Sequence, residues 1–151
     1  MKKHPLLFIA LGAILTFTSC KTEEDYPLEN YEGYWQYTEK GEVNLYNNSG
    51  VLLLKDDVNR TGMMKITKIT DNYLKIGNAN YQVENNELIG NTTKDNYGNV
   101  TLEYAVDGTK TYKGTISKDK IEITEEGSGQ WANFSLEYGE YTRKITTTYT
   151  R

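Results

Sequence analysis

Apolar side chains recur at every second position over most of this sequence, and that period constrains the fold more than any other feature. Over 100–106, 132–138 and 141–149 the apolar residues alternate with polar or charged ones. Successive side chains of a strand point to opposite faces, so each run predicts a strand with one face on a core. No stretch of ten or more residues shows the apolar stripe of a helix. The chain is therefore expected to be all-β.

Short polar segments between these runs predict tight turns. Pairs of Asn, Asp, Gly and Lys tolerate the backbone angles of hairpin turns, and a four-residue turn is expected at 47–50. Longer loops are expected at 56–62, 92–99 and 125–130. About ten short strands joined in this way predict an antiparallel up-and-down meander, which closes into a barrel of about 8–10 strands and so removes its edges. The two-residue turns are expected at Asp71-Asn72, Asn85-Asn86, Asp107-Gly108 and Lys118-Asp119.

The N-terminus has the features of a bacterial secretion signal. Lys2 and Lys3 are followed by an apolar stretch over 6–15, and the small residue Ser19 precedes Cys20, the only cysteine. An apolar stretch of about ten residues is too short for a bilayer crossing, which needs roughly 20. We therefore expect residues 1–19 to be a signal peptide.

The segment Phe17-Thr18-Ser19-Cys20 resembles a lipoprotein signal, in which the cysteine becomes the acylated first residue. The resemblance implies lipid attachment, such as palmitate, at Cys20, and two or more acyl chains hold a protein stably on a membrane. Lys21 followed by an acidic cluster resembles the export signal of Bacteroidetes lipoproteins, which implies an outer-membrane, surface-exposed location. Two alternatives stay open: a conventional signal cut near Thr18-Ser19, and an uncleaved anchor helix.

Composition then limits the partners of the remaining chain. Loss of Lys2 and Lys3 lowers Lys+Arg from 17 to 15 against 21 Asp+Glu, a net charge of about −6. An acidic domain repels phosphate backbones, so no nucleic acid partner is expected. Residues 20–31 are acidic with little to bury and are expected to form a flexible stalk. Residues 32–151 are then long enough for one domain.

Gly33-Tyr34-Trp35, at the start of the first expected strand, matches the Gly-X-Trp signature of lipocalins. Residues 64–76 resemble the central hairpin of small lipocalin-like lipoproteins of the Bacteroidetes, and the likeness in pattern covers 31–151. It implies that Gly33 and Trp35 close one barrel end beneath a late-strand cation, for which Arg143 is the best candidate. The alternative is an ordinary core tryptophan and a surface charge. No disulfide or helix after the barrel is found, so the resemblance is to the reduced group.

A barrel of this size is either filled by its own side chains or holds one small ligand. Tyrosine, present 13 times, combines a flat apolar face with a hydroxyl and suits lipids, aromatics or sugars. Trp131, opposite in phase to Phe134, is the aromatic expected to be exposed, and it could mark a rim or a partner surface or simply cap the barrel. The ligand candidates could equally be packed core. Residues with the inward phase are Tyr81, Leu102, Tyr104, Tyr112, Ile116, Phe134, Leu136 and Tyr138.

The sequence lacks the residues that common catalytic mechanisms require. The only histidine, His4, leaves with the signal, and acylation occupies the Cys20 thiol, so a nucleophile has no base and zinc has no ligands. Asp56-Asp57 with Asn59, or Asp95-Asn96 with Asn99, could bind calcium, but neither reproduces a calcium loop. We expect no enzyme, metal or cofactor. The protein is expected to bind a small apolar or amphipathic ligand, or to serve an envelope complex as an accessory subunit with a filled barrel.

Overall fold

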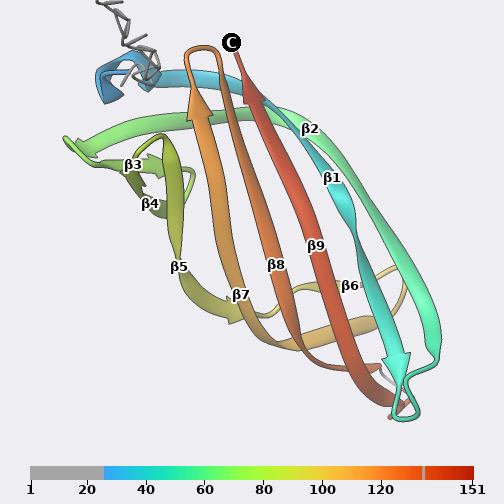
Figure 1. The fold of residues 1–151 in the computed structure, drawn as a ribbon. Helices are drawn as coiled ribbons and strands as arrows, with labels where there is room; N and C mark the ends of the chain where they lie inside the picture. Colours follow the sequence, from blue (N-terminus) through green and yellow to red (C-terminus); the bar gives the residue numbers. More distant parts are fainter. Residues whose placement is uncertain (1–25, 134) are drawn as a thin grey trace, which may run out of the picture.

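The computed structural model describes residues 26–133 and 135–151. Strands dominate this part of the chain, and one short 3₁₀ helix precedes them (Figure 1). In chain order the elements are η1 (Leu28–Tyr31), β1 (Gly33–Asn47), β2 (Leu52–Thr70), β3 (Tyr73–Ile76), β4 (Ala79–Glu84), β5 (Glu87–Asp95), β6 (Gly98–Asn99), β7 (Tyr104–Ser117), β8 (Lys120–Asn133) and β9 (Tyr138–Thr150).

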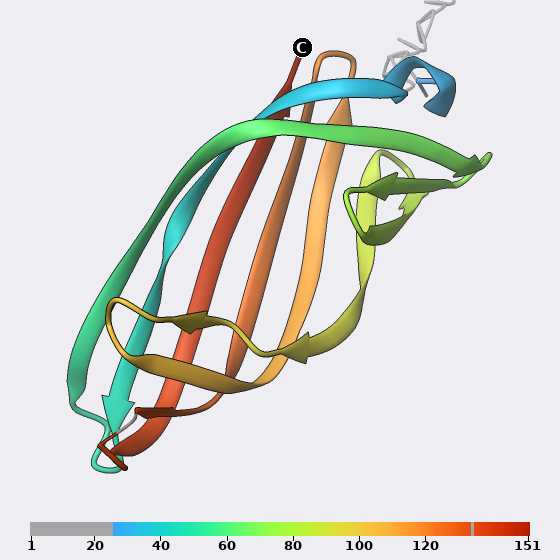
Figure 2. The same cartoon turned by 180° about the vertical axis from the view of Figure 1, so that it is seen from behind.

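All strands belong to one antiparallel sheet that closes on itself. The strand order is β5-β4-β3-β2-β1-β9-β8-β7-β6, and an additional pairing of β5 with β7 joins eight strands into a barrel. The short β6 pairs only with the start of β7, through Asn99 and Tyr104 among others. Figure 2 shows β6 at the front, beside the start of β7 and crossing in front of β9. The expected antiparallel meander and its closure are confirmed.

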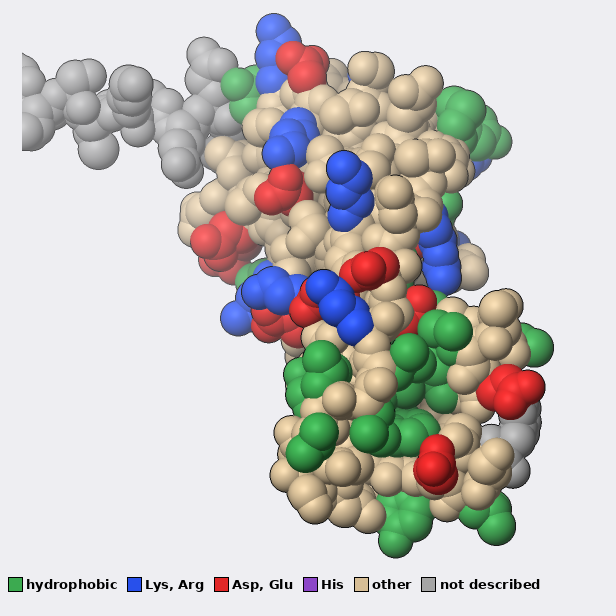
Figure 3. Space-filling view, turned by 90° about the vertical axis from the view of Figure 1, so that its right-hand side faces the viewer, with side chains coloured by type: hydrophobic (Ala, Val, Ile, Leu, Met, Phe, Trp, Pro, Cys, Tyr) green, Lys and Arg blue, Asp and Glu red, His purple; other side chains and the backbone are tan. Residues whose placement is uncertain are grey.

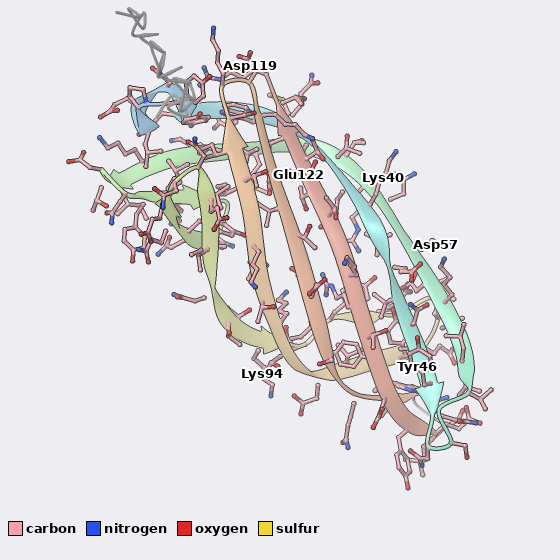
Figure 4. The ribbon with its side chains drawn as sticks, viewed as in Figure 1. Lys40, Tyr46, Asp57, Lys94, Asp119 and Glu122 are labelled. Atoms are coloured by element: carbon pink, nitrogen blue, oxygen red, sulfur yellow. The ribbon has the colours of Figure 1, made fainter. Side chains whose placement is uncertain are left out.

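The two ends of the barrel are distinct, and we call the end at which the chain enters the barrel proximal and the other end distal. The proximal end carries η1 and the β7–β8 turn, where Asp119 lies in Figure 4. The distal end carries the β1–β2 and β8–β9 turns, and Tyr46 lies close to it on β1. Lys40 and Asp57, also labelled there, point outward from β1 and β2.

Four of the expected turns are where the sequence predicted them. The segments 71–72, 85–86, 118–119 and 48–50 separate successive strands. Asn85 and Asn86 have φ values of 50° and 60°, the left-handed pair that a two-residue hairpin turn requires. Asparagine adopts this region more readily than most residues, so the local sequence is sufficient to set this turn.

The strands are longer than the sequence predicted, and four expected breaks are wholly or partly wrong. Residues 56–62 lie within β2, 125–130 within β8, and 92–95 within β5. Asp107-Gly108 lies inside β7 rather than at a turn. A side chain at Gly108 would come within 2.2 Å of the Ser128 carbonyl oxygen, so this glycine permits a close approach of β8 instead of a reversal.

The barrel interior contains two separate apolar clusters. The proximal cluster surrounds Trp35, and the distal cluster surrounds Trp131. Buried members of the proximal cluster are Leu28, Tyr31, Trp35, Ile66, Leu74, Ile76, Tyr81, Leu88, Ile116, Ile121, Ile123 and Tyr149. Those of the distal cluster are Val43, Leu45, Val58, Tyr104, Val106, Trp131, Tyr141 and Ile145.

The described part of the expected stalk is packed on the barrel. Leu28 and Tyr31 of η1 are buried, and the Tyr31 hydroxyl donates to the Ser117 carbonyl over 3.1 Å. Two large apolar side chains therefore offset the acidic composition of this segment, and the packed domain begins before residue 32. Residues 20–25 of the expected stalk, the signal peptide and Cys20 lie outside the described residues.

Candidate functional site

Trp35 closes the proximal end, as the resemblance implied, but its cationic partner is different. The indole is fully buried, donates to the Tyr31 carbonyl over 2.8 Å and stacks on the Tyr31 ring. The Arg151 guanidinium lies 4.8 Å from the Trp35 ring centroid and also donates to the Glu32 carbonyl. Gly33, with φ of +127°, turns the chain from η1 into β1.

The expected stacking of Arg143 on Trp35 is wrong, and strand register explains why. Gln36 pairs with Thr150 and Val43 with Arg143, so Arg143 lies seven residues along β1 from that end. Only Arg151, just after β9, lies close enough to reach Trp35. Alternation in the sequence placed Arg143 on the inner face but could not say which residue of β1 it would meet.

Arg143 instead belongs to a layer of buried charges between the two apolar clusters, which we call the ionic belt. The belt consists of Asp95, Lys110, Glu125 and Arg143, from β5, β7, β8 and β9. Asp95 is fully buried, and Arg143 Nη1 lies 3.3 Å from its Oδ1. The Tyr141 hydroxyl also donates to Asp95 over 2.9 Å. Burial of such charges requires this mutual pairing.

The ionic belt retains hydrogen-bonding capacity. Arg143 Nη2 forms an ion pair with Glu125 Oε1 over 2.5 Å. Glu125 Oε1 and Arg143 Nε are buried and have no hydrogen-bond partner among the described residues. Lys110 Nζ, 3.5 Å from the other Glu125 oxygen, completes the layer. Such atoms are usually satisfied by water or a bound polar group.

In the distal half of the barrel, side-chain hydrogen bonds join β2 to the connection between β5 and β7, where the backbones do not pair. Asp56, buried on β2, accepts hydrogen bonds from the Tyr104 hydroxyl at 2.6 Å and the Asn99 amide at 2.8 Å. The Tyr97 hydroxyl donates to the same carboxylate over 3.3 Å. Asp56 and Asn99 come from the two expected calcium candidates, and here they bond to each other.

Four of the eight expected ligand-binding residues point inward and are buried or nearly so. Tyr81, Ile116 and the partly buried Tyr112 belong to the proximal cluster, and Tyr104 belongs to the distal one. The Tyr81 and Tyr112 rings meet edge to face at 6.0 Å. Their packing with each other makes them core residues as the barrel stands.

The inward phase expected for three other candidates is wrong. Leu136 is 86% exposed, Tyr138 is 63% exposed and Leu102 is 40% exposed. Positive φ values at Glu103 and Leu136 interrupt the two-residue period just before β7 and β9, so the alternation does not continue across these turns. Phe134 lies outside the described residues.

Trp131, expected at the rim, is buried in the distal cluster. Its indole donates to the Tyr46 carbonyl over 2.8 Å. Its burial contradicts the expected exposure at a rim or partner surface and agrees with the alternative in which it caps the barrel. Each end of the barrel therefore has one tryptophan bonded to a backbone carbonyl.

The buried tyrosines remain protonated well into the alkaline range. Burial raises the pKa of Tyr31 to about 12. Burial also raises the pKa of Tyr81, Tyr104, Tyr141 and Tyr149, and hydrogen bonds to Asp56 and Asp95 add to the effect at Tyr104 and Tyr141. These hydroxyls are donors rather than bases at neutral pH.

A cleft of about 470 Å³ lies beside η1 at the proximal end, and we call it the proximal cleft. Leu28, Val83 and Ile116 supply apolar surface, and Ile116 is one of the expected ligand-binding residues. A second cleft of about 570 Å³ adjoins it and shares Ile116. The remaining residues that line the proximal cleft are Tyr26, Pro27, Glu29, Lys68, Asp71, Asn85 and Asn86.

Charge is concentrated at one side of the proximal cleft. Lys68 forms ion pairs with Glu29 of η1 and, over 2.7 Å, with Asp71. Its ammonium lowers the pKa of both carboxyls, and those carboxylates raise the pKa of Lys68. The three side chains hold η1 against the end of β2. The cleft thus combines an apolar floor with a charged rim.

Within residues 26–133 and 135–151, no group of three or more His, Cys, Asp or Glu side chains is placed to hold a metal ion. No helix in this part of the chain is long and apolar enough to cross a membrane. In comparisons with known proteins, no family model, no curated protein and no solved structure matches this chain.

The ionic belt is the feature that sequence reasoning missed. Lys110, Glu125 and Arg143 each stand on the inward phase of their strands, where apolar residues are expected. Three charges of mixed sign on inward positions were a usable signal of a buried network. The proximal cleft gave no such signal, because its lining comes from η1 and two separate turns.

Proposed function

We propose that this protein is a lipoprotein, tethered to the outer membrane through acylated Cys20, that binds a small amphipathic ligand in the proximal cleft. The observation that carries the proposal is the cleft itself. Its volume of about 470 Å³ lies within the range of small-molecule sites. Its lining combines three apolar side chains with an ion-paired lysine and two asparagines.

The barrel interior is a poorer location for the ligand. Large side chains such as Trp35, Leu74 and Ile121 are fully buried there, and the ionic belt separates the two clusters. An apolar ligand that spanned the interior would have to cross buried charges, and desolvated charges without partners are costly. We therefore place the ligand outside the packed core.

The chemistry of the cleft defines the ligand class. Leu28, Val83 and Ile116 would contact an aliphatic or ring portion, while Asn85 and Asn86 offer amide donors and acceptors. Lys68 is already neutralised by two carboxylates, so a strongly anionic headgroup gains little from it. A neutral or zwitterionic amphiphile fits this arrangement best.

The tether is tested by Cys20→Ser. The variant should leave the membrane fraction, because the acyl chains supply the stable attachment. Protein level and folding are checked by circular dichroism of the released form. If Cys20→Ser sediments with membranes as the natural chain does, the tether proposal is wrong.

Ligand binding is tested by the fluorescence of Trp35, which stacks on Tyr31 of η1. Trp131→Phe removes the other tryptophan, and fatty acids, sterols and glycans are then titrated. A binder should shift Trp35 emission, and Val83→Glu in the cleft should abolish that shift. Ile89→Glu, on the outer face of β5, is the matched control and should leave it unchanged.

A filled barrel also favours a second candidate, an accessory subunit of an envelope complex. This candidate predicts no response of Trp35 to any of these small molecules. Native mass spectrometry of the protein extracted from its own membranes separates the two. A small co-purifying mass supports ligand binding, and a protein subunit supports the accessory role.

A further inference from the structure

Large apolar side chains are gathered at the distal end on the surface of the barrel, away from both the core and the proximal cleft. Figure 3 shows apolar side chains gathered on the lower half of the face that carries β1 and β2. We call them the distal patch. Its members, with exposures of 50–86%, are Val51, Leu52, Leu53, Leu136 and Tyr138 from the β1–β2 and β8–β9 turns and the strands beside them.

The β1–β2 turn that supplies most of this patch breaks the alternating pattern. The eight residues from Asn47 to Leu54 carry no charge and end in four consecutive apolar residues, of which the first three are at least half exposed. A run of exposed apolar residues costs solubility unless it has a function. Leu53 also lines a cleft of about 410 Å³ with Leu136 and Tyr138, so two turns contribute to one surface.

We propose that the distal patch docks on the surface of a lipid bilayer as a second membrane contact. This inference goes beyond the proposed ligand binding and rests on the proposed anchor at Cys20. Tyr26 is six positions after Cys20, and an extended chain spans at most about 3.5 Å per residue. The anchor therefore holds the proximal end within roughly 20 Å of the membrane, and the distal patch reaches the bilayer when the barrel lies along its surface.

The form of the patch favours lipid over a folded protein. Leu53 and Leu136, 52% and 86% exposed, project into solvent. A protein partner would need a pocket shaped for each of them, whereas acyl chains accept a projecting side chain of any shape. Tyr138 adds a ring with a polar hydroxyl, a side chain suited to the membrane–water boundary.

The charges around the patch suit a zwitterionic surface. In Figure 3 a band of basic and acidic side chains crosses the middle of this face, just beyond the patch. Between β1 and β2, which this face carries, Lys55 pairs with Glu42 at 2.7 Å and Arg60 with Glu39 at 3.6 Å. Both signs are present in pairs, so the band complements headgroups that also carry both signs. Docking should therefore not depend on anionic lipid.

The test places a reporter in the patch of the natural, anchored protein. Full-length protein is extracted from membranes and reconstituted into phosphatidylcholine vesicles, with or without bromine on the acyl chains. Leu53→Trp reports on the patch, and Ile89→Trp, of similar exposure on β5, is the matched control. Trp35 and Trp131 contribute the same buried background to both variants.

We expect brominated lipid to reduce the added fluorescence of Leu53→Trp by roughly twofold or more and to leave Ile89→Trp unchanged. Leu136→Asp in the Leu53→Trp background should remove the quenching. If Leu53→Trp is not quenched while the protein still floats with the vesicles, docking is wrong and the anchor stands. If Leu53→Trp is shielded only in native membranes and crosslinks to a protein, the partner is that protein, and the lipid proposal is wrong. If the protein does not float with the vesicles, the anchor proposal and the docking proposal are both wrong. Ligand binding at the proximal cleft is independent of every one of these outcomes.

Discussion

The proximal and distal halves of the barrel are closed in different ways. In the proximal half the wall is a continuous ladder, in which β2 pairs with β3 and the pairing continues through β4 and β5 to β7. In the distal half the side of β2 between Leu52 and Met64 that faces away from β1 has no strand partner among the described residues. Asp56 and Arg60 close that side with their side chains.

This difference separates two sources of stability. A backbone ladder depends little on which side chains it carries, because every residue supplies a donor and an acceptor. A wall closed by side chains depends on a few residues and their desolvation. We therefore expect single substitutions to open the distal half more easily than the proximal half, and the experiments below test that contrast.

The largest effect is expected at the boundary between the halves. Arg143→Leu leaves Asp95 fully buried without its cation, and loss of one partner of a buried pair costs about 3–5 kcal/mol of unfolding free energy. Urea denaturation followed by circular dichroism measures the loss. Arg143→Lys keeps the charge and should cost less. A loss below about 1 kcal/mol would show that the ionic belt does not hold the halves together.

The two tryptophans compare the cores directly. Trp35→Ala and Trp131→Ala each remove a buried indole and should cost about 3–5 kcal/mol, with Trp35 at the upper end. Trp35 also loses its stacking on Tyr31 and the Arg151 contact, which are worth about 1 kcal/mol together. Denaturation followed by far-ultraviolet circular dichroism avoids the missing fluorophore. Equal losses would argue against a stronger proximal core.

Removal of single tyrosine hydroxyl groups tests how far side-chain hydrogen bonds stabilise the distal half of the barrel. Tyr104→Phe removes a 2.6 Å donor to the Asp56 carboxylate and should cost about 1.5–3 kcal/mol. Tyr31→Phe removes a donor to a neutral carbonyl and should cost about 0.5–1.5 kcal/mol. Thermal and urea unfolding of both variants give the comparison. The reverse order would place the more important hydroxyl in the proximal half.

Alkaline pH should lower the stability of the fold, and ionisation of Tyr31 should contribute to this loss. Its pKa is about 12 in the folded protein against an ordinary 10.0, so the folded state keeps a proton that the unfolded chain releases between these values. The stability from this difference is complete below pH 10 and falls as pH rises toward 12. Tyr31→Phe should make the fall shallower. An unchanged slope would show that Tyr31 ionises alike in both states.

The smallest effects are expected at surface ion pairs. Lys68→Ala, beside η1, and Lys55→Ala, beside the distal patch, each break two ion pairs at the surface and should lower the stability less than any of the substitutions above. Raising the salt concentration should reduce both losses. A larger, salt-independent loss for Lys68→Ala alone would show that η1 depends on this residue for its packing.

Local sequence was sufficient for much of the fold. Alternation identified the strands, and Asn85-Asn86 identified a hairpin by the positive φ that asparagine tolerates. Asp107-Gly108 was wrong as a turn because a glycine that admits a neighbouring strand looks, in sequence, like a glycine that reverses the chain. The phase of Leu136 and Tyr138 was wrong because a left-handed residue in the preceding turn resets the alternation.

The candidate site depended on contacts between distant segments. Ile116 was found from its phase, but the rest of the proximal cleft comes from η1 and turns far apart in the chain. The partner of Trp35 was missed because a cation on the inner face can meet any residue of the adjacent strand until the register is known. A register shift of eight residues would bring Arg143 to the position of Arg151.

By itself, the sequence determined that this chain forms an antiparallel β-barrel, because a two-residue apolar period leaves each strand one face to bury. It also determined which side chains face inward along unbroken strands. Only the tertiary structure decided that charges from four strands form the ionic belt, that Arg151 covers Trp35, and that side chains close the distal wall. These features depend on strand register and barrel closure, which are set by the packing of all strands together and not by any local pattern.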